Sequence, residues 1–163
     1  PIVRHDDVFK MRYSEDPPYE VVSTKDVSFK ELQEMGRFAR YWDLVANSGN
    51  FLEARELLLA THESPFQAFF HFSSWLFLQV GKRSSINLKT LAELVFAYLT
   101  NVRGGGIEDI GPIVARDYER GGRSDLPRVL APYASSHMAV GERVLALKRQ
   151  QRTLLSQSQG VGE

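Results

Sequence analysis

Hydrophobic residues recur at intervals of three and four over most of the chain after residue 28, which is the spacing of amphipathic α-helices. This pattern predicts helices over 28–47, 51–61, 66–80, 88–102, 108–119 and 138–155, with a further helical turn over 126–130. The first stripe consists of Leu32, Met35, Ala39, Trp42 and Val45. The stretch 66–80 is apolar on almost every side, so we expect it to form the most deeply buried helix, with Phe70 and Trp75 in the core.

Capping signals support the starts of three of these helices. Ser28 followed by Glu31 is a capping box, in which each side chain can bond the other residue's backbone amide. Ser64 precedes Pro65, which is a favoured residue at the first helical position. Asn87 is expected to cap the helix that begins at residue 88. The prediction of a helical fold therefore rests on helix-capping residues as well as on hydrophobic periodicity.

The first 27 residues have a different character. The pair Pro17-Pro18 excludes a helix at that point, and residues 19–24 have the β-branched and aromatic content of a short strand. A single strand is not stable alone, and no convincing second strand follows. The fold class expected is therefore mainly all-α: a single helical domain of about six to seven helices over 28–155, preceded by an extended segment over 1–27 and followed by a frayed end over 156–163.

Composition narrows the class of protein further. The chain has 163 residues, 43% of them hydrophobic, and its 20 basic residues balance 20 acidic ones, so no global field attracts nucleic acid. It contains no cysteine, which excludes disulfides, thiolate metal sites and cysteine-held iron–sulfur clusters from this chain. Residues 66–80 are fewer than the roughly 20 apolar residues that span a membrane. We expect a cytoplasmic protein that does not cross a membrane.

Common catalytic and metal-binding patterns are missing from the sequence. His5, His62, His71 and His137 lie too far apart to form a zinc pair on one helix, so we expect no metal site. The run 104–106 of three glycines lacks the lysine of a phosphate-binding loop and is interpreted as a helix connector. No serine lies in the Gly-x-Ser-x-Gly elbow of hydrolases. The chain itself is predicted to be inactive, with no catalytic, cofactor-binding or metal-binding residue.

Basic residues gather in the last predicted helix, at Arg143, Lys148, Arg149 and Arg152. A solvated helix face is the favoured interpretation, because the neutral net charge makes nucleic acid an improbable partner. The alternative is an interaction module that binds a protein or a nucleic acid through this helix.

The first helix carries an unusual polar stripe made of Arg37, Arg40, Asp43 and Asn47, beside Trp42. Arg40 and Asp43 have the i,i+3 spacing of an ion pair. One interpretation is a salt-bridge network between helices or domains, and the other is a patch that faces a substrate. Both make these four residues the candidate interdomain or substrate-side residues of the chain.

The same helix carries a family resemblance. Residues 38–51, FARYWDLVANSGNF, resemble a signature in the C-terminal region of radical S-adenosylmethionine proteins of the cobalamin-binding type. Residues 9–14 and 17–24 are similar to the end of the catalytic barrel of that family, where the chain enters an appended helical domain of uncharacterised role. The similarity is specific over residues 9–51 and looser beyond them.

This resemblance implies that an upstream barrel carries out the catalysis and that this chain has a different role. In the family, a CxxxCxxC loop holds a four-iron–four-sulfur cluster, S-adenosylmethionine is the cosubstrate, and an upstream domain is of the cobalamin-binding type. None of these cysteines occurs here, so no catalytic residue can be transferred to this chain. The implied role is that of an accessory domain that closes the barrel or helps to hold its substrate. The chain begins with Pro1, and we expect it to be part of a longer polypeptide whose missing barrel pairs with residues 19–24; a dimer of the isolated chain is the other way to pair them.

Overall fold

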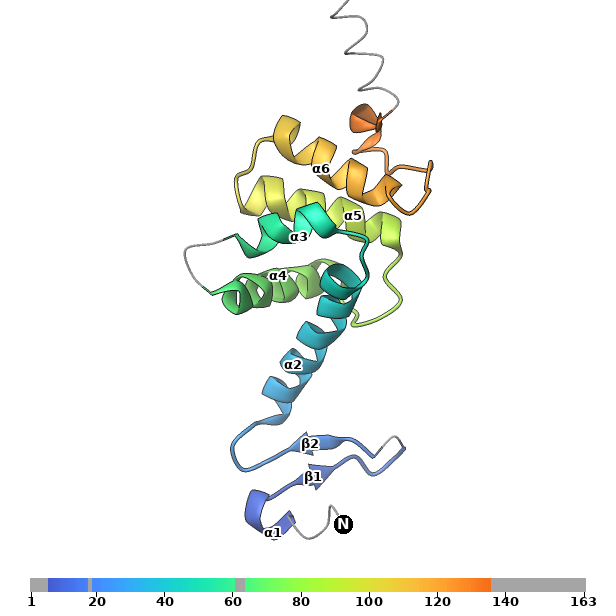
Figure 1. Cartoon of the computed structure of the whole chain (residues 1–163). Coiled ribbons are helices and arrows are strands. Elements are labelled where there is room, and N and C mark those ends of the chain that lie inside the picture. Colours follow the sequence, from blue (N-terminus) through green and yellow to red (C-terminus); the bar gives the residue numbers. More distant parts are fainter. Residues whose placement is uncertain (1–5, 18, 61–63, 136–163) are drawn as a thin grey trace, which may run out of the picture. The chain divides into compact units, whose positions relative to one another are not determined.

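The computed structural model describes residues 6–17, 19–60 and 64–135, and this part of the chain is mainly helical (Figure 1). Five helices have eight residues or more: α2 (Phe29–Trp42), α3 (Leu52–Leu59), α4 (Pro65–Val80), α5 (Leu88–Ala97) and α6 (Ile107–Glu119). Shorter elements are α1 (Asp6–Phe9), the 3₁₀ turn η4 (Ala131–Tyr133) and the strands β1 (Arg12–Tyr13) and β2 (Val21–Ser23). Two π-helical turns, η2 (Asp43–Asn47) and η3 (Tyr98–Val102), extend α2 and α5. The predicted fold class is confirmed.

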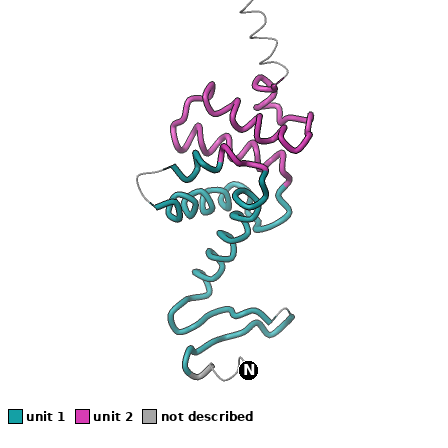
Figure 2. The backbone as a smooth tube through the Cα atoms, viewed as in Figure 1, with its two compact units in different colours: residues 1–49, 55–86 teal, residues 50–54, 87–163 magenta. Residues whose placement is uncertain are grey.

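The chain divides into two compact units, coloured separately in Figure 2. Unit 1 comprises residues 1–49 and 55–86, and unit 2 comprises residues 50–54 and 87–163. The first residues of α3 therefore belong to unit 2, and its remainder belongs to unit 1. This division is internal to the chain, and the predicted boundary between an upstream domain and residues 28–155 stays a prediction.

The capping signals of the sequence are confirmed. Ser28 Oγ accepts from the backbone amide of Glu31, and the Glu31 carboxylate accepts from the amide of Ser28 at 2.7 Å. The side chain of Ser64 accepts from the amide of Gln67 at the start of α4, and Asn87 accepts from the amide of Lys89 at the start of α5. Local hydrogen bonds therefore fix where these three helices begin.

The N-terminal segment corrects one prediction. The strand over residues 19–24 finds its partner within the chain, because Val21–Ser23 pairs antiparallel with Arg12–Tyr13. The partner precedes the strand and is only two residues long, which is why alternation in the sequence did not reveal it. The amide of Lys25 also donates to the carbonyl of Phe9 at 2.8 Å, which ties α1 to this hairpin. A missing barrel is therefore not needed to pair β2.

The core of unit 1 forms where α2 packs on α4, but it does not enclose α4 on every side. Phe69, Phe72 and Leu76 are fully buried, whereas Leu78 is 80% exposed and Phe66 is 57% exposed. The prediction that Phe70 and Trp75 lie in the core is wrong, because both are only half-buried. Since α4 has large apolar residues on nearly every side, its sequence does not reveal which face is covered. Several large apolar side chains of unit 1 consequently remain at its surface.

The core of unit 2 forms between α5 and α6. Its fully buried side chains include Leu91, Val95, Val114 and Leu130. Gly111 lies under the ring of Tyr133: a Cβ atom at residue 111 would be 2.4 Å from Tyr133 Cε2. The absence of a side chain at Gly111 therefore allows η4 to pack closely on α6.

Candidate functional site

A hollow of about 460 Å³ opens on unit 1 beside the C-terminal half of α2. Its lining residues are Phe38, Ala39, Trp42, Asp43 and Phe66. Four of them come from α2 and its π-helical extension, and Phe66 comes from the first turn of α4. The hollow is therefore an aromatic depression with one carboxylate at its edge, and its volume is in the range of small-ligand sites.

The aromatic wall of this hollow is held by ring contacts. Phe38 and Trp42, one turn apart on α2, stack with centroids 6.0 Å apart and planes 12° apart. Phe66 lies 5.1 Å from Phe38, and the fully buried Phe69 meets the edges of Phe38 at 5.3 Å and Trp42 at 4.9 Å. Since Phe69 anchors both α2 rings from beneath, the wall is pre-organised before any ligand arrives.

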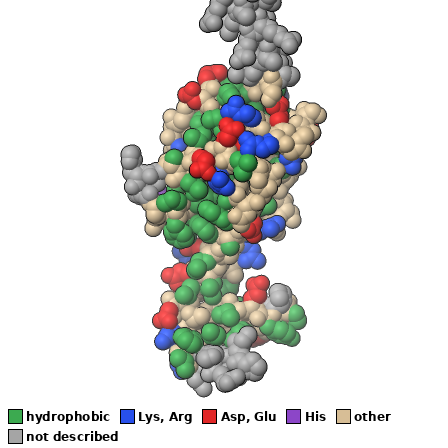
Figure 3. Space-filling view, viewed as in Figure 1, with side chains coloured by type: hydrophobic (Ala, Val, Ile, Leu, Met, Phe, Trp, Pro, Cys, Tyr) green, Lys and Arg blue, Asp and Glu red, His purple; other side chains and the backbone are tan. Residues whose placement is uncertain are grey.

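A second hollow, of about 330 Å³, lies further toward the N-terminus of α2. Its lining residues are Val27, Glu31, Glu34, Met35 and Phe70. The rings of Phe66 and Phe70 stack 6.0 Å apart, and Phe38 lies 6.4 Å from Phe70, so the same aromatic cluster borders both hollows. We call the residues that line the two hollows the α2–α4 surface. Hydrophobic side chains reach the surface along these helices in the space-filling view (Figure 3).

Charge on the α2–α4 surface is of one sign. Among the described residues, three carboxylates line the hollows, at Glu31, Glu34 and Asp43, and no lysine, arginine or histidine does. Glu31 is ionised at neutral pH, and hydrogen bonds from Ser28 lower its pKa further. The surface is thus apolar at its centre and negatively charged at its ends.

The four residues of the predicted polar stripe do not act together. Arg37 turns toward the interior of unit 1: its guanidinium lies 4.3 Å from the centroid of the Phe77 ring and 3.8 Å from Glu34. Asp43 lines the first hollow and accepts a hydrogen bond from Asn47 Nδ2 at 2.8 Å. Arg40 is exposed, and in the described part of the chain it forms no ion pair with Asp43. The expected Arg40–Asp43 pair is therefore wrong, and Asn47 is the partner of Asp43.

The geometry of η2 accompanies this change of partner. Residues Asp43–Asn47 form a π-helical turn, which is wider than an α-helical turn and is frequent at functional sites. The sequence predicted a helix as far as Asn47, which is confirmed, but it gave no sign of the π geometry. It also missed Phe38, Ala39 and Phe66 as lining residues; an aromatic residue directly after Ser64-Pro65, where a helix has just begun, was the available signal for Phe66.

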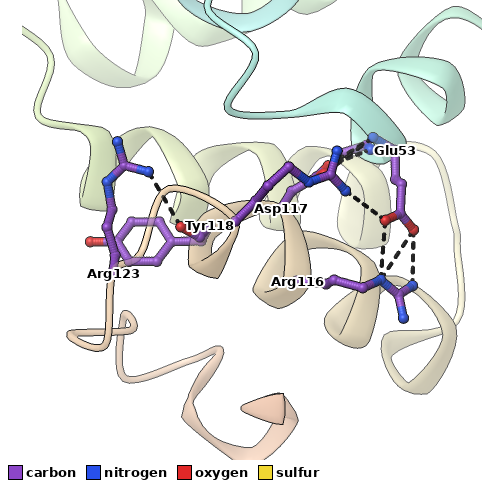
Figure 4. Close-up of polar contacts among 7 residues, drawn as sticks. Glu53, Arg116, Asp117, Tyr118 and Arg123 are labelled. Carbon is purple, nitrogen blue, oxygen red and sulfur yellow. Dashed lines mark hydrogen bonds and ion pairs between the residues drawn. The ribbon is translucent and has the colours of Figure 1, made fainter.

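Unit 2 holds the densest polar cluster among the described residues (Figure 4). The carboxylate of Asp117, which is fully buried on α6, accepts from the amides of Glu53 at 3.0 Å and Ala54 at 2.8 Å, and from Arg120 at 3.0 Å. Arg116 and Arg120 also bind the Glu53 carboxylate, at 2.9 and 2.8 Å. Every oxygen of Asp117 therefore has a partner inside the protein. This cluster fastens the start of α3 to α6, and these contacts are structural.

The sequence also raised expectations about metal ligands, the glycine run and a basic helix. Within residues 6–17, 19–60 and 64–135, no group of three His, Asp or Glu side chains could hold a metal ion, and no helix is long and apolar enough to cross a membrane. The glycine run connects η3 to α6, and Gly104 there has a φ of 72°, which fits a connector. His5, His62, His137 and the predicted basic helix with Arg143, Lys148, Arg149 and Arg152 lie outside the described residues.

Comparison with known proteins places the chain in a family. No curated protein and no solved structure matches it. A family model described as "Protein of unknown function (DUF4080)" matches residues 7–160, which include most of both units and the whole α2–α4 surface. The match covers most of the 163 residues, and the chain therefore belongs to this family of uncharacterised domains.

Proposed function

We propose that the chain is the non-catalytic C-terminal accessory domain of a cytoplasmic radical S-adenosylmethionine enzyme of the cobalamin-binding type. Its α2–α4 surface contacts the catalytic barrel or the substrate held there. The four-iron–four-sulfur cluster, S-adenosylmethionine and cobalamin belong to the upstream part of such an enzyme, since this chain has no cysteine to hold a cluster. The family match supports a shared domain but assigns it no function.

One coincidence carries the proposal. Residues 38–51, which bear the resemblance to radical enzymes, contain every lining residue of the first hollow except Phe66. A stretch needed only for folding would keep its large side chains inside, yet this one presents Phe38, Ala39 and Trp42 to a hollow that opens at the surface. Exposed apolar patches of this kind are typical of binding surfaces.

The chemistry of the hollow defines what it can contribute. The rings of Phe38, Trp42 and Phe66 offer apolar contact, and the Asp43 carboxylate offers a hydrogen-bond acceptor. Arg40, which directly follows the lining residue Ala39 on α2, offers an exposed hydrogen-bond donor. These groups can bind and orient a partner or a substrate and can exclude water from it. Binding and orientation of this kind fit the role of an accessory domain.

The alternative function is an interaction module that binds a protein or nucleic acid through the helix predicted over 138–155. That helix lies outside the described residues, so this alternative stays a prediction. It differs from the proposal in the residues that it needs: Arg143, Lys148, Arg149 and Arg152 rather than the α2–α4 surface.

The proposal is tested first by the upstream reading frame, which should encode a CxxxCxxC loop a couple of hundred residues before Pro1. In that full-length enzyme, Phe66→Ser should lower turnover by about tenfold or more, because it removes a contact from the α2–α4 surface. Arg40→Ala should lower turnover too, because Arg40 is exposed on α2 next to the lining residue Ala39. Leu78→Ser is the matched control, because Leu78 is 80% exposed on α4 but lines neither hollow. An upstream frame without the cysteine loop, or unchanged turnover in both Arg40→Ala and Phe66→Ser, would refute the proposal.

A further inference from the structure

We infer that the α2–α4 surface receives a cationic amphipathic helix presented by the upstream catalytic domain. This deepens the proposed function by giving the chemistry of the partner, and it rests on that function for the source of the helix. The inference stands on three features of unit 1: the shape of the surface, its exposed apolar groups and the sign of its charge.

The dimensions of the surface fit a helix. Its lining residues run along α2 from Glu31 to Asp43, which at 1.5 Å per residue is roughly 18 Å, or about three helical turns. The two hollows lie toward opposite ends of this stretch, and Phe66 and Phe70 border it from α4. A partner helix could place one large side chain in each hollow, as in other helix-in-groove complexes.

Exposed apolar side chains supply the driving force for binding the partner helix. Met35 is 60% exposed and Phe66 is 57% exposed, although both lie beside aromatic rings that are already packed. Covering such side chains with apolar groups is favourable, and the anchored rings lose little conformational entropy when they are covered. A purely polar partner would gain none of this energy.

Charge selects among apolar partners. Glu31, Glu34 and Asp43 line the hollows without any lining cation. Among the described residues, Glu31 accepts hydrogen bonds only from Ser28, Asp43 accepts one from Asn47, and Glu34 alone of the three forms an ion pair, with Arg37 at 3.8 Å. A helix with lysine or arginine beside its apolar face would place its cations against these carboxylates while their aliphatic stems cover the rings. An acidic helix would be repelled.

The test uses the chain alone and two synthetic helical peptides of about 18 residues. Both peptides have leucine along one face; beside that face, one peptide has lysine and the other has glutamate. Binding is followed by calorimetry. The leucine–lysine peptide should bind at least about tenfold more tightly than its leucine–glutamate twin in low salt. The triple variant Glu31→Gln/Glu34→Gln/Asp43→Asn should abolish this difference, and its thermal melt confirms that it is folded, because glutamine can also complete the capping box.

A second triple variant, Glu15→Gln/Glu20→Gln/Asp26→Asn, is the matched control. It makes the same change in net charge within unit 1, but none of its residues lines a hollow. It should alter the affinity for the leucine–lysine peptide by less than about threefold. The inference would be overturned if neither peptide bound, if both bound equally, or if the control variant lost as much affinity as the first triple variant.

Two further outcomes keep this test separate from that of the proposed function. A dimer of the chain that Phe66→Ser dissociates, with no peptide bound, would make a second copy the occupant and would refute the inference while leaving the upstream enzyme intact. Conversely, peptide selectivity with no CxxxCxxC loop upstream would refute the proposed function and, with it, the assigned source of the helix.

Discussion

The buried carboxylate of Asp117 on α6 accepts a hydrogen bond from the backbone amide of Ala54 at 2.8 Å, so that a residue of one helix caps the start of another. The free amides at a helix N-terminus are usually bonded by the residue that precedes the helix. Here the acceptor lies 63 residues away in the sequence, and it also accepts from Glu53. The carboxylate of Asp117 therefore links the start of α3, which belongs to unit 2, to α6.

Replacing Asp117 should strongly destabilise the chain. We expect Asp117→Ala to lower the free energy of unfolding by about 2–4 kcal/mol, because it leaves two amides without their acceptor and Arg120 without a buried partner. Glu53→Gln is the matched comparison, because it removes only ion pairs of partly exposed side chains and should cost less than about 1 kcal/mol. Urea denaturation measures both. Equal losses in the two variants would mean that Asp117 does not secure α3.

Because Gly111 lies against Tyr133, the effect of Gly111→Ala on stability should change sign when the Tyr133 ring is removed. Gly111→Ala should destabilise the chain by about 1 kcal/mol, since the clash with the Tyr133 ring, about 1–3 kcal/mol, outweighs the gain in helix propensity of about 1 kcal/mol. In a Tyr133→Ala background the clash is gone, and the same substitution should be stabilising by about 1 kcal/mol. Thermal or urea unfolding of the four proteins gives both values. A destabilising effect in both backgrounds would show that something other than Tyr133 restricts residue 111.

Phe69 and Phe66 should differ sharply in their contribution to stability. Phe69→Ala should cost about 3–5 kcal/mol, because Phe69 is fully buried beneath Phe38 and Trp42. Phe66→Ala should cost less than about 1.5 kcal/mol, because more than half of Phe66 is already in contact with solvent. Chemical denaturation distinguishes the two. A loss at Phe66 as large as that at Phe69 would mean that Phe66 is a core residue and is not held ready for a partner.

The capping box of α2 should give the chain a measurable dependence on acid. Hydrogen bonds from the Ser28 amide and hydroxyl lower the pKa of Glu31, so the ionised form stabilises the fold above the unfolded-state pKa of about 4.3. This stabilisation is lost as the pH falls through the lower pKa of the folded state. The melting temperature of the native chain should therefore exceed that of Glu31→Gln at pH 7, and the difference should shrink below about pH 4.3.

The control for this measurement is Glu15→Gln, which removes an exposed carboxylate that accepts no hydrogen bond among the described residues. Its difference from the native chain should change little over the same range of pH. A Glu31→Gln difference that stays constant down to pH 3 would contradict the role of the capping box.

Local features of the fold could be predicted from the sequence, and long-range ones could not. Ser28, Ser64 and Asn87 identify helix starts because a cap depends on residues within one turn. The strand Arg12–Tyr13 is too short to show an alternating pattern, and the bond from Asp117 to Ala54 joins residues that nothing local relates. Capping residues therefore allow the helix starts to be predicted from the sequence, whereas the packing of the helices on one another is seen only in the folded structure.

The candidate site shows the same limit. Asp43 was predicted as an interdomain or substrate-side residue, which stays a prediction, and the structure places it in η2 at the edge of the first hollow. Its expected ion pair with Arg40 is replaced by a hydrogen bond from Asn47. Which rings of α4 stay exposed depends on how α2 crosses that helix. Hydrophobic periodicity carries little information on that choice in a helix with large apolar residues on nearly every side, and it does not separate the exposed Phe66 from the buried Phe69.

Site-specific photo-crosslinking in the full-length polypeptide tests most directly whether the α2–α4 surface is the docking surface. A benzophenone amino acid replaces Ala39, which is exposed and lines the first hollow, or Leu78, which is 80% exposed and lines neither hollow. After irradiation and proteolysis, the probe at residue 39 should be joined to peptides of the upstream domain, and the probe at residue 78 should not. Crosslinks to that domain from residue 78 but none from residue 39 would contradict the proposed docking surface.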